Sequence, residues 1–226
     1  MTPRICVSIL PRNIPDALTL IKKVEEAKAD LIEVRLDCLG ATTKLKELVQ
    51  STKIPLIATD KLASETGFFS GTEAERQQRL LNAAESGFEY VDIDLSSSNS
   101  QEISKLKQLG VKPIVSCHKF DGPLSHSAME RVLKQEIATD ASVCKIVIKA
   151  KKIEDNLPVL NFVGFHSAKT KLVCFCMGEA GRVSRLLSPM FGAFFTFASL
   201  EQGSETASGQ MTIGEMRALY DILGAK

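Results

Sequence analysis

The feature that most constrains the fold is an alternation of short apolar runs with amphipathic helical patterns, repeated eight times along the chain. The apolar runs are rich in the β-branched and aromatic residues that strands favour. Strands that alternate with helices form parallel sheets, because each helix carries the chain back to start the next strand in the same direction. The predicted strands are about Ile5–Ile9, Leu31–Leu36, Leu56–Thr59, Tyr90–Leu95, Lys112–Cys117, Val143–Ile148, Leu172–Cys176 and Ala193–Thr196.

Eight strand-then-helix units in 226 residues predict an α/β fold, the closed (β/α)₈ or TIM barrel, in a single domain over residues 1–226. An open doubly wound sheet is the alternative. It is weakened because no G-x-G-x-x-G or G-x-x-x-x-G-K-[ST] motif follows the first strand. The same absence gives no reason to expect a dinucleotide or a nucleoside triphosphate.

Local signals place several helix ends. A first helix is predicted over about Pro15–Ala29, where apolar residues recur at helical spacing. Thr72-Glu73-Ala74-Glu75 is a capping box that starts a helix ending at Gly87. Ser127-x-x-Glu130 predicts another start.

Charge and hydropathy exclude several classes of partner. Lysine and arginine total 28 against 27 acidic residues, and a net charge of +1 gives no reason to expect nucleic acid or an anionic membrane. No apolar run approaches the ~18 residues that span a bilayer. The first residues enter a strand-like segment without the apolar region of a signal peptide, so we expect a cytoplasmic protein.

The six cysteines lie in or beside the apolar runs, as reduced core residues of the cytosol do. A zinc set of Cys117, Cys174 and Cys176 with histidines is conceivable, but the spacing matches no usual ligand pattern. We therefore predict no metal. His126 and His166 lie in polar, loop-like surroundings and are predicted to be surface residues.

One charged residue interrupts the most apolar predicted strand. Lys145 shares a strand face with Val143 and Val147, because side chains alternate along a strand. Burial favours the neutral amine, which is a nucleophile toward carbonyl carbon. The alternatives are a lysine whose amine reaches water at the strand end, and one that pairs with a carboxylate.

Polar side chains gather where the predicted strands end. Because a barrel places its chemistry at the C-terminal ends of its strands, we expect these side chains at one mouth. They are Glu33 and Arg35 on the second strand, Asp60, Lys61 and Glu65 after the third, Asp92 and Asp94 on the fourth, His118 after the fifth, Lys145 on the sixth, and Arg182 and Arg185 in the seventh unit.

Most of these residues have a structural alternative. Glu33 and Arg35 could pair with each other and plug the barrel end. His118 could be a hydrogen-bonded structural histidine, and Arg182 and Arg185 a solvated pair on a helix. The carboxylates that could serve only to neutralise nearby cations are Asp92 and Asp94.

Six short motifs keep one order along nearly the whole chain: Glu33-Val34-Arg35-Leu36-Asp37, Glu65 after the third strand, Cys117-His118-Lys119-Phe120, Cys144-Lys145-Ile146, Ser184-Arg185-Leu186 and Gly209-Gln210. In this order the chain resembles the type I 3-dehydroquinate dehydratases, the Schiff-base enzymes of the shikimate pathway. The resemblance implies a (β/α)₈ barrel, chemistry without metal or other cofactor, a small-molecule substrate and a homodimer.

Roles follow from the resemblance, residue by residue. Lys145 is the expected imine-forming lysine, His118 the general acid and base, and Glu65 the residue that orients His118. The residues expected to bind substrate are Ser8, which lines the site, Glu33, Arg35 and Lys61, which hold ring hydroxyls, and Arg185, Thr206 and Gln210, which hold the carboxylate. The small polar stretch that contains Thr206 and Gln210, residues 201–210, is predicted to be a mobile loop.

The implied reaction converts 3-dehydroquinate to 3-dehydroshikimate by loss of water. An iminium at Lys145 draws electrons from the carbon that loses its proton. An ordinary histidine pKa of about 6.5 lets His118 take that proton and return one to the departing hydroxyl. This chain has Lys61 where the family usually has arginine, so a point charge replaces a two-pronged donor.

Two other functions fit part of the pattern. A Schiff-base (class I) aldolase would also need a lysine on the sixth strand. Such aldolases commonly handle phosphorylated sugars, however, and no glycine-rich phosphate loop follows the seventh or eighth strand. A barrel without catalytic activity could bind a small carboxylate through Arg185 and Gln210.

Overall fold

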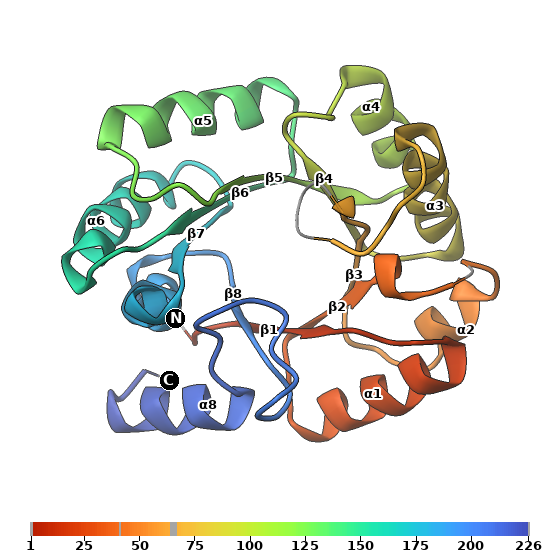
Figure 1. The fold of residues 1–226 in the computed structure, drawn as a ribbon, viewed down its shortest axis with the longest axis horizontal. Helices are drawn as coiled ribbons and strands as arrows, with labels where there is room; N and C mark the ends of the chain where they lie inside the picture. Colours follow the sequence, from red (N-terminus) through yellow and green to blue (C-terminus); the bar gives the residue numbers. More distant parts are fainter. Residues whose placement is uncertain (1, 41, 64–66, 226) are drawn as a thin grey trace.

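The structure is a computed structural model that describes residues 2–40, 42–63 and 67–225. Its centre is one sheet of eight parallel strands in the order β7-β6-β5-β4-β3-β2-β1-β8, curved around a common axis (Figure 1). The strands are β1 (Ile5–Ile9), β2 (Leu31–Arg35), β3 (Leu56–Thr59), β4 (Tyr90–Asp94), β5 (Lys112–Lys119), β6 (Val143–Lys149), β7 (Leu172–Met177) and β8 (Thr196–Ala198).

The two ends of this sheet meet. β1 pairs with β2 on one side and with β8 on the other. Between β8 and β7, the backbone N–H of Phe194 donates a 2.8 Å hydrogen bond to the carbonyl oxygen of Leu172. The sheet is therefore a nearly closed barrel. The predicted TIM barrel is confirmed, and the open doubly wound alternative is wrong because the first and last strands are neighbours.

The helices lie outside the strands (Figure 1). They are α1 (Ile14–Glu26), α2 (Leu45–Gln50), α3 (Glu73–Ser86), α4 (Ser100–Gln108), α5 (His126–Ala138), α6 (Asn156–His166), α7 (Arg182–Leu187) and α8 (Ile213–Ile222). Among the described residues, none of these helices has the length and apolar character needed to cross a membrane.

Local capping explains where the helices begin and end. α3 has the predicted capping box at Thr72 and ends at Gly87, which adopts φ +101°. The predicted start at Ser127 is wrong, because the side chain of Ser125 caps α5 by accepting from the backbone N–H of Ala128. α1 ends three residues earlier than predicted, just before Lys28 takes a positive φ of 58°.

Alternation along the strands sorts the side chains into two cores. Outward residues such as Val34 and Ile146 pack beneath the helices. Inward residues form an apolar layer across the barrel, made of Cys6, Leu31, Ile57, Tyr90, Ile114, Val143, Val173 and Phe195. One alternation further toward the C-terminal strand ends, the inward positions of six strands are polar: Ser8, Glu33, Thr59, Asp92, Ser116 and Lys145. The apolar layer is thus the floor of a polar site.

Candidate active site

A cavity of about 820 Å³ opens at the C-terminal ends of the strands. It is large enough for a drug-sized molecule and lies where a barrel of this kind places its chemistry. The predicted site residues that line it are Glu33, Arg35, Lys61, His118, Lys145, Arg185, Thr206 and Gln210. Residues from three strands (β2, β5 and β6), the segment after β3, helix α7 and the loop after β8 therefore meet, as the sequence predicts.

Lys145 lies at the bottom of this cavity, with only 5% of its surface exposed. Its Nζ donates a 2.8 Å hydrogen bond to Oδ2 of Asp92 and lies 3.9 Å from Oε2 of Glu33. Burial lowers the pKa of Lys145, but the charges of Asp92 and Glu33 outweigh burial, and the pKa is raised. The carboxylate-paired alternative is confirmed. Burial does favour the neutral amine, as predicted, but the two carboxylates compensate the charge and reverse the net effect on the pKa.

Asp92 is a buried carboxylate shared by two lysines. Besides Lys145, it accepts from Nζ of Lys61 at 2.9 Å and from the hydroxyl of Ser116 at 2.7 Å. Burial raises the pKa of Asp92, but the two ammonium groups bring it well below its usual value. Asp92 therefore stays ionised and is the counter-ion of the site. The alternative that Asp92 neutralises nearby cations is confirmed, although the family resemblance gave it no role in the reaction.

Glu33 and Arg35 do not pair with each other, so that alternative is wrong. One oxygen of Glu33 accepts from the Ser8 hydroxyl at 2.5 Å, and the other accepts from the Thr59 hydroxyl at 2.9 Å. Arg35 instead makes two parallel bonds to Asp37, at 2.8 and 2.5 Å. The guanidinium is thereby fixed at the rim by its own neighbour, and the Glu33 carboxylate is oriented by two hydroxyls.

His118 lies at the end of β5, partly exposed at the cavity wall. In the β5–β6 register it is two residues nearer the mouth than the level of Lys145. Burial and the positive charges of Lys61 and Lys145 lower its pKa well below 6.5. The imidazole is therefore neutral near pH 7 and able to accept a proton.

Arg185, on α7, is a buried cation without an anionic partner in the described part of the chain. It is 1% exposed, its guanidinium carbon lies 4.4 Å from the centroid of the Phe175 ring, and its Nε has no hydrogen-bond partner there. Burial lowers its pKa to about 10. Arg182, by contrast, is exposed and pairs with Glu179 at 2.8 Å. The alternative of a solvated arginine pair is therefore right for Arg182, which is exposed, and wrong for Arg185, which is buried.

The loop after β8 brings Thr206 and Gln210 to the cavity. The two residues hold each other: the Gln210 side chain accepts from the Thr206 backbone N–H at 2.7 Å and donates to its hydroxyl at 3.0 Å. The loop also rests on the turn after β7, where the Gly178 N–H donates to the Ser208 carbonyl at 3.0 Å. Gly209 lies so close to Gly178 that a Cβ at position 209 would be 2.1 Å from the Gly178 oxygen.

One predicted catalytic residue, Glu65, lies outside the described residues. Its role in orienting His118 stays a prediction.

Comparison with known proteins identifies the family to which this barrel and its cavity belong. The model of the family described as Type I 3-dehydroquinase matches residues 5–226. The chain belongs to the type I 3-dehydroquinase family. The 3-dehydroquinate dehydratase of Dehalococcoides mccartyi is 38% identical over 218 residues, which cover 96% of this chain and 95% of that protein.

More distant relatives agree. The 3-dehydroquinate dehydratase of Methanothermobacter thermautotrophicus is 32% identical over 225 residues, covering 99% of this chain and 98% of that protein. The crystal structure of 3-dehydroquinate dehydratase from Geobacillus kaustophilus superposes with a TM-score of 0.89 at 24% identity, covering 98% of this chain and 91% of that chain. The predicted enzyme class, a type I 3-dehydroquinate dehydratase, is confirmed in preference to an aldolase or a barrel that only binds.

Proposed function

We propose that the chain dehydrates 3-dehydroquinate through an imine on Lys145, with His118 as general acid and base. The observation that carries this proposal is Lys145 itself, a lysine buried inside the barrel whose amine opens into the cavity beside a neutral histidine. Burying an ammonium group and its counter-ion is costly, and a lysine that forms an imine with substrate gives this arrangement a chemical use.

Arg185 fits the carboxylate of the substrate. A buried guanidinium without an anion is unfavourable, and a bound carboxylate supplies the missing charge through two parallel hydrogen bonds. The Gln210 amide and Thr206 hydroxyl lie in the same cavity and can complete this end. Binding there fixes the ring so that its keto group faces Lys145.

The ring hydroxyls face the opposite wall. Glu33, which Ser8 and Thr59 hold in place, can accept from a hydroxyl. Lys61 can donate to one through an N–H that Asp92 and Ser116 do not use, because an ammonium group has three donors. Arg35 contributes from the rim with the donors that Asp37 leaves free.

The first chemical step needs a neutral Lys145. Since Asp92 stays ionised, we assign the Lys145 proton to the neutral imidazole of His118, which lines the same cavity. The amine then attacks the ketone to give a carbinolamine. Its hydroxyl takes the proton back from His118 and leaves as water, so that an iminium and a neutral His118 remain. Asp92 and Glu33, the charges that raise the pKa of Lys145, then stabilise the iminium cation.

Dehydration follows from the iminium. Neutral His118 removes the proton next to the iminium carbon and produces an enamine. Protonated His118 then gives a proton to the hydroxyl on the following carbon, and water departs as the enamine electrons return to form the new double bond. Hydrolysis of the iminium by a second water releases 3-dehydroshikimate and restores the amine.

Turnover of a lysine variant tests this function. The product is a conjugated enone, so its formation is followed by ultraviolet absorbance. Lys145→Met should lower turnover at least about 10³-fold, because the electron sink is lost. The control is Lys112→Met, which removes a lysine at the N-terminal start of β5, paired there with Glu89. Turnover that survives in Lys145→Met would contradict the proposal, and fragments with fewer carbons would indicate an aldolase.

A further inference from the structure

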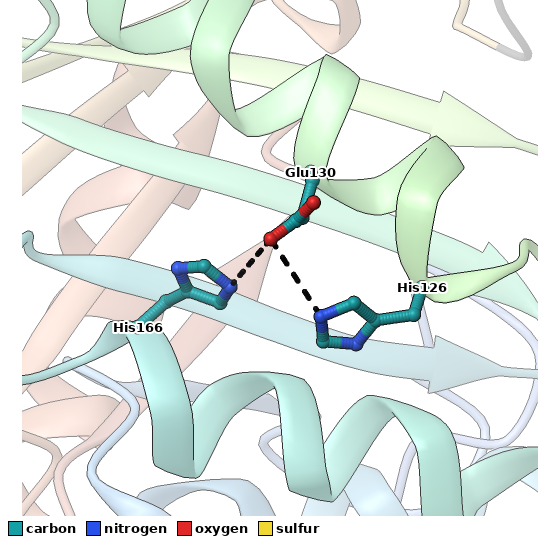
Figure 2. A group of neighbouring side chains, drawn as sticks. All are labelled: His126, Glu130 and His166. Carbon is teal, nitrogen blue, oxygen red and sulfur yellow. Dashed lines mark ion pairs between the residues drawn. The ribbon is translucent and has the colours of Figure 1, made fainter.

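Three side chains gather on the outside of the barrel, away from the cavity. His126 and Glu130 are one turn apart on α5, and His166 is the last residue of α6. Figure 2 shows the Glu130 carboxylate lying between the two imidazole rings. Nothing in the proposed reaction uses these residues.

The donor atoms are close to metal-ligand spacing. Oε1 of Glu130 lies 3.7 Å from Nε2 of His126 and 3.9 Å from Nε2 of His166. One ligand atom from each residue lies within 4.8 Å of the others. Ligands about 2.0–2.2 Å from a tetrahedral zinc ion are separated by roughly 3.5 Å, so a small rotation of the side chains would bring these three into place.

A second observation points to a ligand. Nε2 of His166 is buried and has no hydrogen-bond partner among the residues that the structure describes. The His166 ring packs against the Phe162 ring, with centroids 4.3 Å apart. The His126 ring contacts the same phenylalanine edge-on, with centroids 5.4 Å apart. A buried ring nitrogen normally has a partner. Here its lone pair is available to a bound ion.

The donor set suits a cation of borderline softness. The neutral imidazole is the form that binds metal. Two imidazole nitrogens and one carboxylate oxygen favour Zn²⁺ over Mg²⁺ or Ca²⁺, which prefer oxygen ligands.

We propose that His126, Glu130 and His166 form a zinc-binding site that joins α5 to α6, with water as the fourth ligand. The two helices follow β5 and β6, the strands that carry His118 and Lys145. Zinc at this place holds together the helices that support the catalytic strands. It stabilises the folded chain by binding the native state in preference to the unfolded one.

The chain has three histidines in all, which makes a direct test possible. Chelator-treated, ¹⁵N-labelled protein is titrated with zinc while the imidazole resonances are followed by NMR, with His118→Gln used to assign the active-site signal. At one equivalent of zinc, the signals of His126 and His166 should shift together and that of His118 should stay. A shift of His118 alone, or no shift at one equivalent, would overturn the proposal.

Variants separate this site from zinc binding elsewhere. Glu130→Gln and His166→Gln should each weaken zinc binding at least about tenfold. Arg131→Gln, an exposed neighbour on α5, is the matched control and should bind as the wild type does. Zinc should raise the thermal midpoint of the wild type and of the control but not of His166→Gln. Equal binding by all four proteins would assign the zinc to another place and refute the site.

Discussion

At the scale of single residues, the site is a set of charges shared around Asp92. Two ammonium groups, on Lys61 and Lys145, contact one carboxylate. The positive charges of both lysines lower the pKa of His118 and so disfavour its charged form. The site therefore keeps a protonated Lys145 together with a neutral His118, and under the proposed mechanism one proton has to move between them.

Lys61 should control the pKa of His118. Lys61→Met removes a positive charge that depresses this pKa, so the pKa should rise toward 6.5. In the wild type, kcat/KM should fall only below the depressed pKa, where the imidazole becomes charged; in Lys61→Met the fall should begin at a higher pH. NMR titration of the His118 imidazole measures the change without substrate. Lys119→Met, an exposed neighbour, is the control, and an unchanged His118 pKa in Lys61→Met would contradict this account.

Replacing Arg185 should weaken substrate binding without lowering the stability of the fold. Arg185→Met removes a buried cation with no anionic partner, so the thermal midpoint should stay level or rise. Substrate should bind more weakly, with kcat/KM lower by roughly 10–100-fold for the lost charge-assisted bonds. Arg182→Met, at the exposed ion pair on the same helix, should change neither value much. A large drop in the midpoint with kcat/KM unchanged would make Arg185 structural.

Residue identity predicted which side chains reach the cavity, but not how they pair there. Strand alternation placed Glu33 and Arg35 on one face. The pairing of Arg35 with Asp37 depends on the 3₁₀ turn Leu36–Cys38, which curls Asp37 back toward the rim. The importance of Asp92 depends on distances across the barrel, which a sequence pattern does not contain.

At the scale of elements, hydrophobic periodicity predicted all eight strands, while tertiary contacts set their ends. The last strand shows the difference, since it was predicted at Ala193–Thr196 and lies at Thr196–Ala198. The N–H of Ala193 donates to the Ser188 carbonyl and so belongs to the preceding turn. Pairing with β1 begins only at Thr196, which lies opposite Ile5.

The loop after β8 should depend on Gly209. Gly209→Ala would bring a Cβ to 2.1 Å from the Gly178 oxygen, at a φ of +77° that disfavours any side chain, and the loop would have to move away from β7. Since that loop carries Thr206 and Gln210, kcat/KM should fall at least about tenfold. Gly203→Ala is the matched control, because Gly203 also has a positive φ, +83°, but open space around it. Equal steady-state kinetics for both variants would show that the seating of the loop does not matter. The mobility predicted for residues 201–210 is a separate prediction.

At the scale of the whole molecule, the barrel wall formed by β5 and β6 contributes both to the outer core and to the lining of the cavity. Outward side chains of β6 pack in one cluster with those of α5, while His118 of β5 and Lys145 of β6 line the cavity. The family relationship and the barrel confirm the predicted fold and enzyme class. The single domain, the homodimer and the cytoplasmic location stay predictions, because no contact within one chain tests them.

Glu136 on α5 should make the stability of the whole chain depend on pH. It is 0% exposed, its carboxyl oxygens have no hydrogen-bond partner in the described part of the chain, and burial, with the charges of Asp92 and Asp94, raises its pKa to about 10. A pKa raised by folding means that the folded state binds the proton more tightly. Stability is therefore highest below the unfolded pKa and falls as pH rises from about 4.5 toward 10, by up to about 1.4 kcal/mol per pH unit.

Glu136→Gln tests that dependence. The amide does not titrate, so the variant should match the wild type near about pH 5 and have the larger free energy of unfolding near about pH 9. Urea denaturation at several pH values measures the difference, and Glu85→Gln on exposed α3 surface is the control. If wild type and Glu136→Gln lose stability with the same slope, the buried carboxyl is not the cause.

The most direct test of the central claim is to trap the imine. The protein is incubated with 3-dehydroquinate and borohydride, which reduces a C=N bond to a stable amine, and the modified peptide is identified by mass spectrometry. We predict one adduct on Lys145, absent from Lys145→Met and still formed in Lys61→Met, although Lys61 is a second buried lysine in the same cavity. An adduct on Lys61, or conversion of substrate without any adduct, would contradict the mechanism.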